Sequence, residues 1–130
     1  MKNRTVLIAD DDRSVRKALR MRLSSWGYQV VESVDGLGVI TQASSRTVAA
    51  LILDYGMPNG DGQAVARMIR GETEAPIIFL SGHDREDFRS IVHDLPDVYY
   101  LHKPLDPEKL RLLLEACLTI SSSPVMAEVA

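Results

Sequence analysis

The sequence lacks several features that would place the protein in a thiolate-metal, secreted or membrane class. Cys117 is the only cysteine, which excludes an intramolecular disulfide and a zinc cluster built on thiolates. No apolar run approaches the roughly 20 residues of a membrane span. The N-terminus also lacks the apolar core of a signal peptide. We therefore expect a cytoplasmic protein that does not bind a membrane.

The chain also lacks a strong excess of charge of either sign. Its 15 Lys and Arg against 18 Asp and Glu give a formal net charge of -3 at pH 7. Nucleic-acid binding would therefore need a local basic patch, and no direct nucleic-acid partner is expected. A Gly-rich phosphate loop ending in Gly-Lys-Ser or Gly-Lys-Thr is missing as well, which argues against nucleotide hydrolysis.

Five short apolar segments are present, and they predict the core of one domain. They are rich in Val, Ile, Leu and Tyr, and three of them are nearly continuous rather than alternating. That pattern is typical of strands buried on both faces of a sheet. At 130 residues the chain is long enough to bury such a core. The segments are Val6–Ala9, Tyr28–Val31, Val48–Leu53, Ile77–Leu80 and Val98–Leu101.

Helical patterns fill the intervals between these segments. Five alternations of strand and helix predict an α/β fold, in which a parallel sheet is covered by helices on both faces. We expect a domain over residues 1–119, and a tail or the start of a linker over Ile120–Ala130. Five helices are expected. The first runs from near Arg13 to before Gly27, the second lies within Gly36–Ser45, and the third runs from an Asp61 N-cap to Gly71. The fourth covers Arg85–His93, and the fifth runs from Pro107 to about Cys117.

Acidic and polar side chains follow four of the five expected strands. The carboxyl ends of parallel strands meet at one edge of a sheet, where such sheets bind ligands. We therefore expect an acidic cluster with a hydroxyl and an ammonium group beside it. The residues are Asp10, Asp11 and Asp12 after the first strand, Asp54 after the third, Ser81 after the fourth, and His102 and Lys103 after the fifth.

The run Asp10-Asp11-Asp12 needs a physical explanation. Two carboxylates about 4 Å apart repel each other by roughly 4 kcal/mol at an effective dielectric constant of 20. Carboxylates without His or Cys at ligand spacing suit a hard divalent ion such as magnesium. Asp12 is better explained as the N-cap of the following helix. A magnesium ion and a lysine around a carboxylate would clamp a phosphoryl group, with the protein's own carboxylate as the attacking group.

Four sequence blocks occur together in order: Asp10-Asp11, LILDYGMPNGDG, IIFLSG and YYLHKP. With these blocks, the chain from about Arg4 to Thr119 resembles the CheY-like receiver domain of two-component response regulators. The resemblance implies a doubly wound, flavodoxin-like (βα)5 fold with five parallel strands in the order 2-1-3-4-5. It also implies a phospho-accepting signalling switch, which catalyses only its own phosphorylation and dephosphorylation.

The resemblance assigns a role to each acidic position. Asp54 would accept a phosphoryl group from a histidine kinase or a histidine phosphotransfer protein in a phosphorelay. Asp10, Asp11, Asp54 and the backbone carbonyl of Gly56 would hold Mg2+.

The resemblance also assigns roles to the residues around the acceptor. Lys103 stands at the position of the family's lysine, and Ser81 stands where a hydroxyl bonds the phosphoryl group. Tyr100 stands at the aromatic position whose rotamer reports activation. Gly56 and His83 occupy the two positions that would tune the lifetime of the phosphate.

Arg13, Arg16, Lys17 and Arg20 form a basic stripe at helical spacing on the first expected helix. Such stripes are usually solvated helix faces. The resemblance offers a second interpretation, in which the region Arg13–Arg20 contacts the histidine kinase. It further implies that the fourth helix, fifth strand and fifth helix form an output face, toward an unknown downstream effector or a second copy in a homodimer.

Two other functional classes remain open at this point. A pseudo-receiver would be an interaction module that no longer uses phosphate, although the complete acidic set argues against it. A phosphohydrolase of the haloacid-dehalogenase type would use Asp10 as its nucleophile, because Asp10 and Asp12 form a D-x-D motif. That family has Gly-Thr soon after the motif, whereas Arg13-Ser14 follow it here, which argues against this class.

Overall fold

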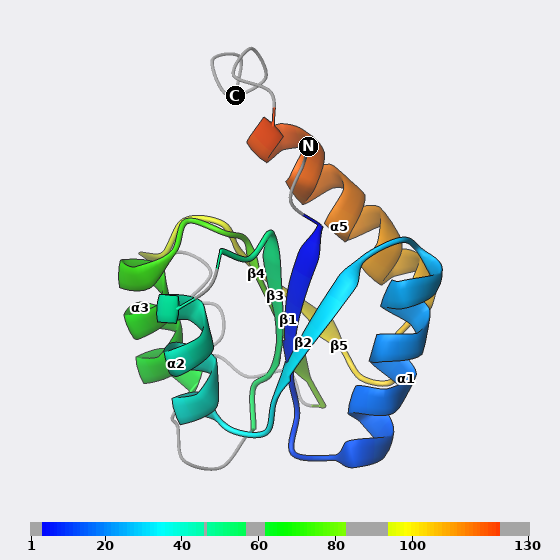
Figure 1. The fold of residues 1–130 in the computed structure, drawn as a ribbon, viewed down its shortest axis with the longest axis horizontal. Helices are drawn as coiled ribbons and strands as arrows, with labels where there is room; N and C mark the ends of the chain where they lie inside the picture. The colour runs from blue at the N-terminus through cyan, green and yellow to red at the C-terminus, as the bar shows by residue number, and fades with distance from the viewer. Residues whose placement is uncertain (1–3, 46, 57–61, 83–93, 123–130) are drawn as a thin grey trace.

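The protein forms a five-stranded parallel sheet covered by helices, as a computed structural model shows (Figure 1). The structure describes residues 4–45, 47–56, 62–82 and 94–122. The strand order is β2-β1-β3-β4-β5, and every neighbouring pair is parallel, so the predicted fold class and order are confirmed. The strands are β1 Thr5–Ala9, β2 Gln29–Ser33, β3 Ala50–Asp54, β4 Ile77–Ser81 and β5 Val98–His102.

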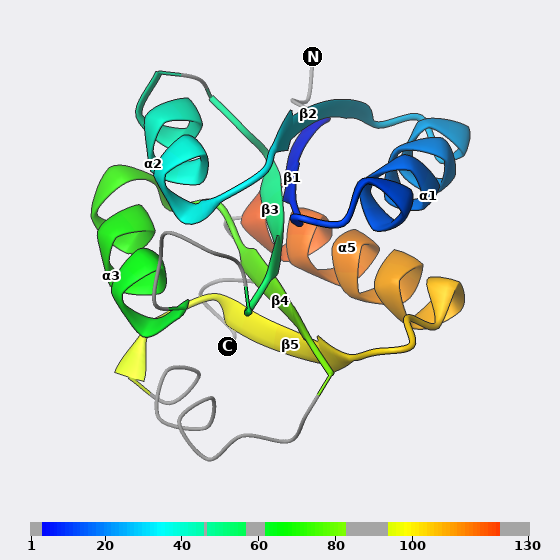
Figure 2. The same ribbon diagram turned by 90° about the horizontal axis from the view of Figure 1, so that it is seen from below.

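Helices cover both faces of this sheet. Figures 1 and 2 show α2 and α3 on one face and α1 and α5 on the other. The expected fourth helix over Arg85–His93 and the expected N-cap Asp61 lie outside the described residues. Among the described residues, no helix has both the length and the apolar character needed to cross a bilayer. The helices are α1 Arg13–Ser25, α2 Gly36–Ser45, α3 Gly62–Glu72 and α5 Pro107–Ser122.

The core divides into two apolar layers, one on each face of the sheet. Because side chains alternate along a strand, β3 sends Leu51 and Leu53 to the α2–α3 layer and Ile52 to the α1–α5 layer. All three of these side chains are buried. The nearly continuous apolar runs in the sequence therefore do belong to strands buried on both faces.

Local signals set the two ends of α1. The Asp12 side chain accepts hydrogen bonds from the backbone N–H groups of Ser14 at 2.8 Å and Val15 at 3.4 Å, which confirms Asp12 as the N-cap. At the other end the chain turns through Gly27, whose φ of +90° lies in the left-handed region that favours glycine.

Most strand boundaries differ from the predicted ones by one or two residues, and α3 ends at Glu72 instead of Gly71. Tyr28 and Val48 are buried, but β2 begins at Gln29 and β3 begins at Ala50, because burial alone does not bring a residue into the ladder. The fifth helix does not end near Cys117 but continues to Ser122. Leu118 extends its apolar face and packs against the α1–α5 layer, so the helix gains contacts beyond Cys117.

Candidate functional site

The carboxyl edge of the sheet, at the bottom of Figure 1, brings together residues from four strands. Asp10 follows β1, Asp54 is the last residue of β3, Ser81 is the last residue of β4, and Lys103 follows β5. Asp10 and Asp54 are 44 residues apart in the sequence, and Asp54 and Lys103 are 49 apart. The parallel ladder aligns all three at one edge of the sheet. The cluster expected at the strand ends is therefore present in the fold.

Lys103 lies between two of the carboxylates. Its Nζ is 3.2 Å from Asp54 Oδ1 and 3.4 Å from Asp10 Oδ2. Its backbone N–H donates to the Ser81 carbonyl at 2.8 Å, which ties the residue to the end of β4. The ammonium group is thus held at the Asp54 carboxylate by contacts of both its side chain and its backbone.

Three carboxylates form a group that fits a hard cation. Asp10, Asp11 and Asp54 each offer one oxygen, and these oxygens all lie within 4.8 Å of one another. Asp10 is buried, Asp54 is 13% exposed and Asp11 is exposed, so the group opens toward solvent on the Asp11 side. An all-oxygen donor set of this kind suits Mg2+, which usually keeps several waters of its own.

Hydrogen bonds from the backbone orient two of these carboxylates. Asp10 Oδ1 accepts the N–H of Asp12 at 2.9 Å, and Asp54 Oδ1 accepts the N–H of Gly56 at 3.2 Å. Each carboxylate therefore has one oxygen engaged with its own loop. Asp54 Oδ1 also meets Lys103, while no hydrogen bond is recorded at Asp54 Oδ2 within the described part of the chain.

Burial and charge act in opposite directions at this edge. Burial raises the pKa of the Asp10 carboxyl; the Asp12 N–H and Lys103 oppose this, and the Asp54 charge adds to it. Burial would lower the pKa of Lys103, but the Asp54 and Asp10 carboxylates outweigh it and raise that pKa above its usual value. Lys103 therefore stays cationic at neutral pH, and added positive charge would favour ionised Asp10.

Ser81 and Tyr100 share one face of the sheet. Phe79 pairs in register with Tyr100, and Ser81 lies two residues after Phe79 on β4. Because side chains alternate along a strand, Ser81 and Tyr100 both lie on the face of the α2–α3 layer. Tyr100 packs against that layer, whereas Tyr99 packs against the other, so the two tyrosines point to opposite faces of the sheet. The Tyr100 ring meets the His102 ring edge-on, with centroids 5.3 Å apart.

Gly56 leaves open space beside the Asp54 carboxylate. A Cβ built there would come no closer than 4.0 Å to Asp54 Oδ1, which is ordinary contact. Among the described glycines only Gly27 has a left-handed φ, so the backbone at Gly56 accepts a side chain. His83, the other residue expected to flank the phosphate, lies outside the described residues.

One contact to the acidic loop could not be predicted from the sequence. Arg16 appeared there only as part of a basic stripe, yet its Nη1 donates to the Asp10 carbonyl at 2.6 Å. Glu32 on β2 pairs with both Arg16 and Arg20. Helical spacing alone gave no sign of this, because the contact needs β1, β2 and α1 to be side by side.

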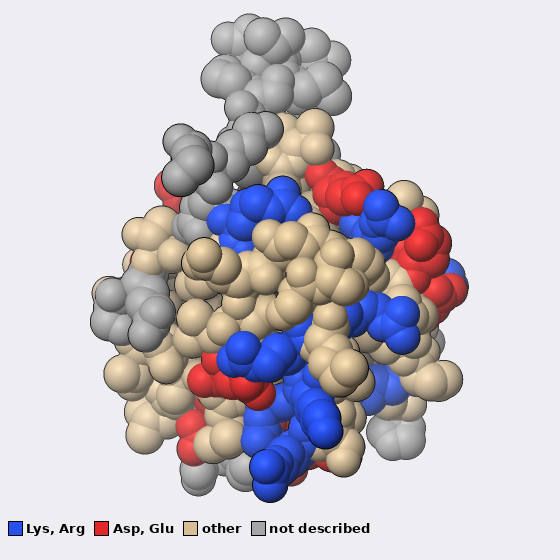
Figure 3. Space-filling view, turned by 45° about the vertical axis from the view of Figure 1, so that its right-hand side comes forward, with Lys and Arg blue, Asp and Glu red and all other residues tan. Residues whose placement is uncertain are grey.

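Basic side chains and an apolar groove flank the site on the α1 side. Figure 3 shows Lys and Arg side chains gathered over α1, where Arg13 and Lys17 are exposed. The adjoining groove has a volume of about 270 Å³ and reaches the lysine of the site. It is lined by Val15, Ala18, Leu19, Arg22, Leu80, Lys103, Pro104, Leu105 and Pro107.

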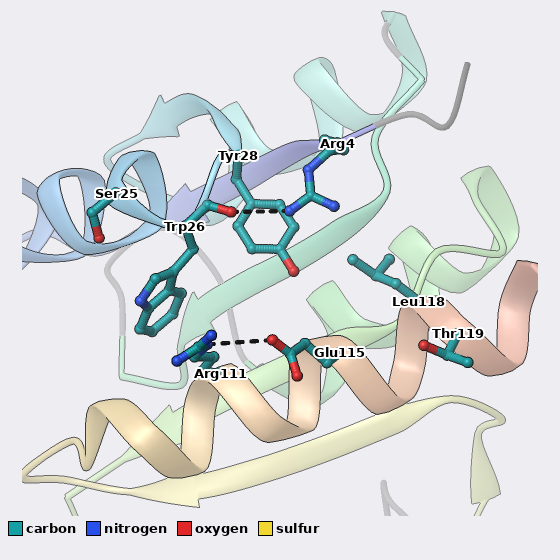
Figure 4. Close-up of a pocket in the computed structure, with 8 residues that line it drawn as sticks. All are labelled: Arg4, Ser25, Trp26, Tyr28, Arg111, Glu115, Leu118 and Thr119. Atoms are coloured by element: carbon teal, nitrogen blue, oxygen red, sulfur yellow. Dashed lines mark hydrogen bonds and ion pairs between the residues drawn. The ribbon is translucent and has the colours of Figure 1, made fainter.

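A second hollow, of about 430 Å³, lies at the opposite edge of the sheet (Figure 4). Arg4 lies over the Tyr28 ring at 4.3 Å from its centroid, and it donates to the carbonyls of Gly27 and Trp26. Across the hollow, Arg111 pairs with Glu115 on α5. This hollow contains no residue of the acidic cluster.

Comparison with known proteins gives relatives of one kind. The response regulator MprA of Mycobacterium tuberculosis is 38% identical over 114 residues, covering 87% of this chain and 50% of that protein. The probable transcriptional regulator ycf27 of Cyanophora paradoxa is 31% identical over 122 residues, covering 94% of this chain and 51% of that protein. The chain therefore spans about half the length of the curated relatives it matches.

Solved structures agree with this relationship. The chemotaxis protein CheY4 of Vibrio cholerae superposes with a TM-score of 0.81 at 25% identity, over 90% of this chain and 100% of that chain. A CheY-like receiver domain from Methanospirillum hungatei reaches 0.85 at 17% identity, over 91% and 95% of the two chains, which shows a shared fold. The family model of the response regulator receiver domain matches residues 6–115. Since that match runs from β1 into α5, the chain belongs to the response regulator receiver domain family of two-component systems.

Proposed function

We propose that Asp54 accepts a phosphoryl group from the phosphohistidine of a histidine kinase or histidine phosphotransfer protein. The observation that carries the proposal is the Asp54 carboxylate, which is 13% exposed, 3.2 Å from Lys103 Nζ and grouped with Asp10 and Asp11. An Asp54 oxygen attacks phosphorus in line, the phosphorus–nitrogen bond breaks, and the imidazole leaves with that electron pair and takes up a proton. The product is an acyl phosphate on Asp54.

The chain's own groups prepare this step in separate ways. Lys103 places positive charge where the phosphoryl oxygens arrive, and the Ser81 hydroxyl at the end of β4 bonds one of them. Asp10, Asp11, Asp54 and the Gly56 carbonyl would hold Mg2+. When bound, magnesium supplies further neutralisation of the phosphoryl charge.

Docking of the phosphodonor protein uses the α1 side of the site. The groove beside Lys103 is apolar, and exposed Arg13 and Lys17 lie on the same helix as its α1 lining. Arg16 and Arg20 are paired with Glu32, so they contribute less to this surface than the sequence stripe suggested. A partner with an apolar helix face and acidic neighbours would match this surface.

Phosphorylation switches a second surface, next to β5. Ser81 and Tyr100 lie on the same sheet face, so movement of Ser81 toward the phosphoryl group would open space for the Tyr100 ring. The change would alter the face that contains β5 and α5, and with it affinity for an effector or for a second copy of the chain. The contribution expected from Arg85–His93 lies outside the described residues.

The proposal is tested by intact-mass measurement after incubation with a small phosphodonor and Mg2+. Wild-type protein should gain the mass of one phosphoryl group, and the Asp54→Asn variant should gain none. A pseudo-receiver would give no adduct under the same conditions. A phosphohydrolase using Asp10 would turn over phosphate with Asp54→Asn as well as with wild type, which would overturn the proposal.

A further inference from the structure

Arg16 lies in the first turns of α1, and its side chain turns back toward the acidic loop. Its Nη1 donates to the main-chain carbonyl of Asp10 at 2.6 Å, and its Nε lies 3.3 Å from Glu32 Oε1 on β2. The Arg16 side chain is 15% exposed, against 47% for Arg20 one helical turn later. The guanidinium of Arg16 is therefore mostly shielded from solvent and contacts fixed protein groups.

Glu32 holds that guanidinium in place. Its Oε1 faces Arg16, while its Oε2 accepts a hydrogen bond from Arg20 Nε at 2.7 Å. Glu32 pairs in register with Ile8 of β1, so it is anchored to the strand that leads into the acidic loop. Because an arginine donates through a rigid planar fork, fixing Nε on Glu32 also fixes the direction of Nη1.

The carbonyl that Arg16 bonds is part of the peptide unit between Asp10 and Asp11. That unit is planar and contains the Cα atoms of both residues. Holding its oxygen therefore restricts ψ of Asp10 and φ of Asp11, the two rotations next to the unit on which the directions of both side chains depend. The contact uses no carboxylate of the cluster in the hydrogen bonds recorded for the described residues. Arg16 thus orients two candidate ligands without occupying their oxygens.

We propose that Arg16 is a positioning residue for the metal site. It orients the Asp10–Asp11 peptide unit so that both carboxylates face Asp54, and Glu32 locks Arg16 in that orientation. This inference rests on the proposed function, because it concerns the same acidic cluster. It adds a connection from β2, through Glu32 and Arg16, to the position of the carboxylates.

The test compares Arg16→Ala with the matched variant Arg20→Ala. Both changes remove one arginine of α1 and one partner of Glu32, but Arg20 bonds the Val30 carbonyl on β2 instead of the acidic loop. Isothermal titration with magnesium alone, on unphosphorylated protein, should show about tenfold weaker binding for Arg16→Ala, as expected when support of metal ligands is removed. Arg20→Ala should bind magnesium like wild type, with both melting temperatures measured alongside.

Two further variants separate charge from orientation. Arg16→Lys keeps the positive charge but loses the fork, so it should weaken magnesium binding nearly as much as Arg16→Ala. Glu32→Gln keeps Arg16 but releases its lock, so an intermediate loss is expected. Wild-type affinity in Arg16→Lys would mean that charge alone matters, which would overturn a role in positioning.

Amide hydrogen exchange tests the same inference without metal. The Asp11 and Asp12 amides should exchange faster in Arg16→Ala than in wild type, and Arg20→Ala should leave them unchanged. Equal effects of the two arginines on exchange and on magnesium affinity would overturn the proposal. If wild-type protein failed to bind magnesium, the proposed function would fail, whereas selective loosening in Arg16→Ala would still support the orientation of the loop by Arg16.

Discussion

The two edges of the sheet use charged side chains in opposite ways. At the carboxyl edge, Lys103 meets Asp10 and Asp54, so charged groups face one another across three strand ends. At the amino edge, Arg4 and Arg70 donate mainly to backbone carbonyls. At the amino edge the arginines thus satisfy backbone carbonyls and stabilise the fold, whereas the carboxyl edge keeps carboxylate oxygens available to a ligand.

This difference explains why the size of a hollow alone does not identify the candidate functional site. The hollow at Arg4 and Tyr28 is larger than the groove beside Lys103. Its arginines, however, are bonded to Gly27, Trp26 and Glu115, whereas the carboxyl edge groups three carboxylates within 4.8 Å. Chemistry is expected where like charges are held together, because such an arrangement needs a reason beyond stability.

The largest effect should come from Asp54, the proposed acceptor. Asp54→Asn should abolish phosphoryl acceptance, because an amide is nearly isosteric with the carboxylate but cannot act as the nucleophile. Its oxygen can still accept from Lys103 and the Gly56 N–H, so the fold should persist, as circular dichroism would check. Arg4→Ala at the amino edge is the control and should accept phosphate like wild type. Equal labelling of Asp54→Asn and wild type would disprove the assignment.

Asp11→Ala should have the next largest effect. The cluster loses a direct ligand, so magnesium binding should fall by more than the roughly tenfold loss expected for a supporting residue. Phosphorylation by a small donor should slow with it. Metal-free stability should not fall, because repulsion among the acids is relieved. Titration calorimetry and urea unfolding measure the two quantities, and wild-type magnesium affinity in the variant would mean that the ion is held elsewhere.

Arg70→Met, at the amino edge, should lower stability without affecting phosphorylation, the opposite of the effect expected for Asp11→Ala. Arg70 donates to the carbonyls of Thr73, Ala75, Pro96 and Asp97, and the variant leaves these acceptors without that donor. The free energy of unfolding should drop by about 2 kcal/mol. Phosphorylation of the folded protein should be unchanged. Loss of phosphorylation at full stability would contradict the separation of the two edges.

Gly56→Met should change the lifetime of the acyl phosphate severalfold. An acyl phosphate decays when water attacks in line, and the open space beside Asp54 Oδ1 admits that water. A methionine side chain should exclude it, and the φ of Gly56 presents no barrier to the substitution. Loss of the phosphoryl mass is followed over time, with Gly56→Ala as the smaller control. A folded Gly56→Met protein that loses phosphate at the wild-type rate would show that this flank does not limit hydrolysis.

The smallest effect concerns pH and stability. Burial raises the pKa of Asp10 above its unfolded value of 3.8, so the folded state holds this proton more tightly. Its contribution to stability is therefore present at low pH and falls as pH rises from 3.8 through the folded pKa. The free energy of unfolding of metal-free Asp10→Asn should be about 1 kcal/mol higher than that of wild type at pH 7. The difference should shrink toward pH 3 in urea titrations, and a difference independent of pH would contradict this explanation.

Local signals in the sequence were enough to predict much of this fold. Continuous apolar runs located the five strands, and the capping preference of Asp12 located the start of α1, because both depend on nearby residues. The position of Asp54 and Lys103 at one edge followed from the geometry of parallel sheets. Tyr28 and Val48 show the limit, since hydrophobicity reports burial and not membership of a hydrogen-bonded ladder.

Long-range contacts could not be predicted in the same way. Arg16 and Glu32 are 16 residues apart, and their pairing depends on α1 packing beside β2. No local preference encodes that the Arg16 side chain turns toward the Asp10 carbonyl instead of solvent. The residues of the acidic cluster were therefore predictable by type and position, while the residue that orients them was not.

The central claim is that the carboxyl edge accepts phosphate on Asp54. The most direct measurement treats wild-type protein with a small phosphodonor and Mg2+, then with borohydride, which reduces an acyl phosphate to an alcohol. Peptide sequencing by mass spectrometry then locates the reduced side chain. We expect reduction at Asp54 alone. Reduction at Asp10 or Asp11, or the absence of any reduced aspartate in protein that has gained a phosphoryl group, would contradict it.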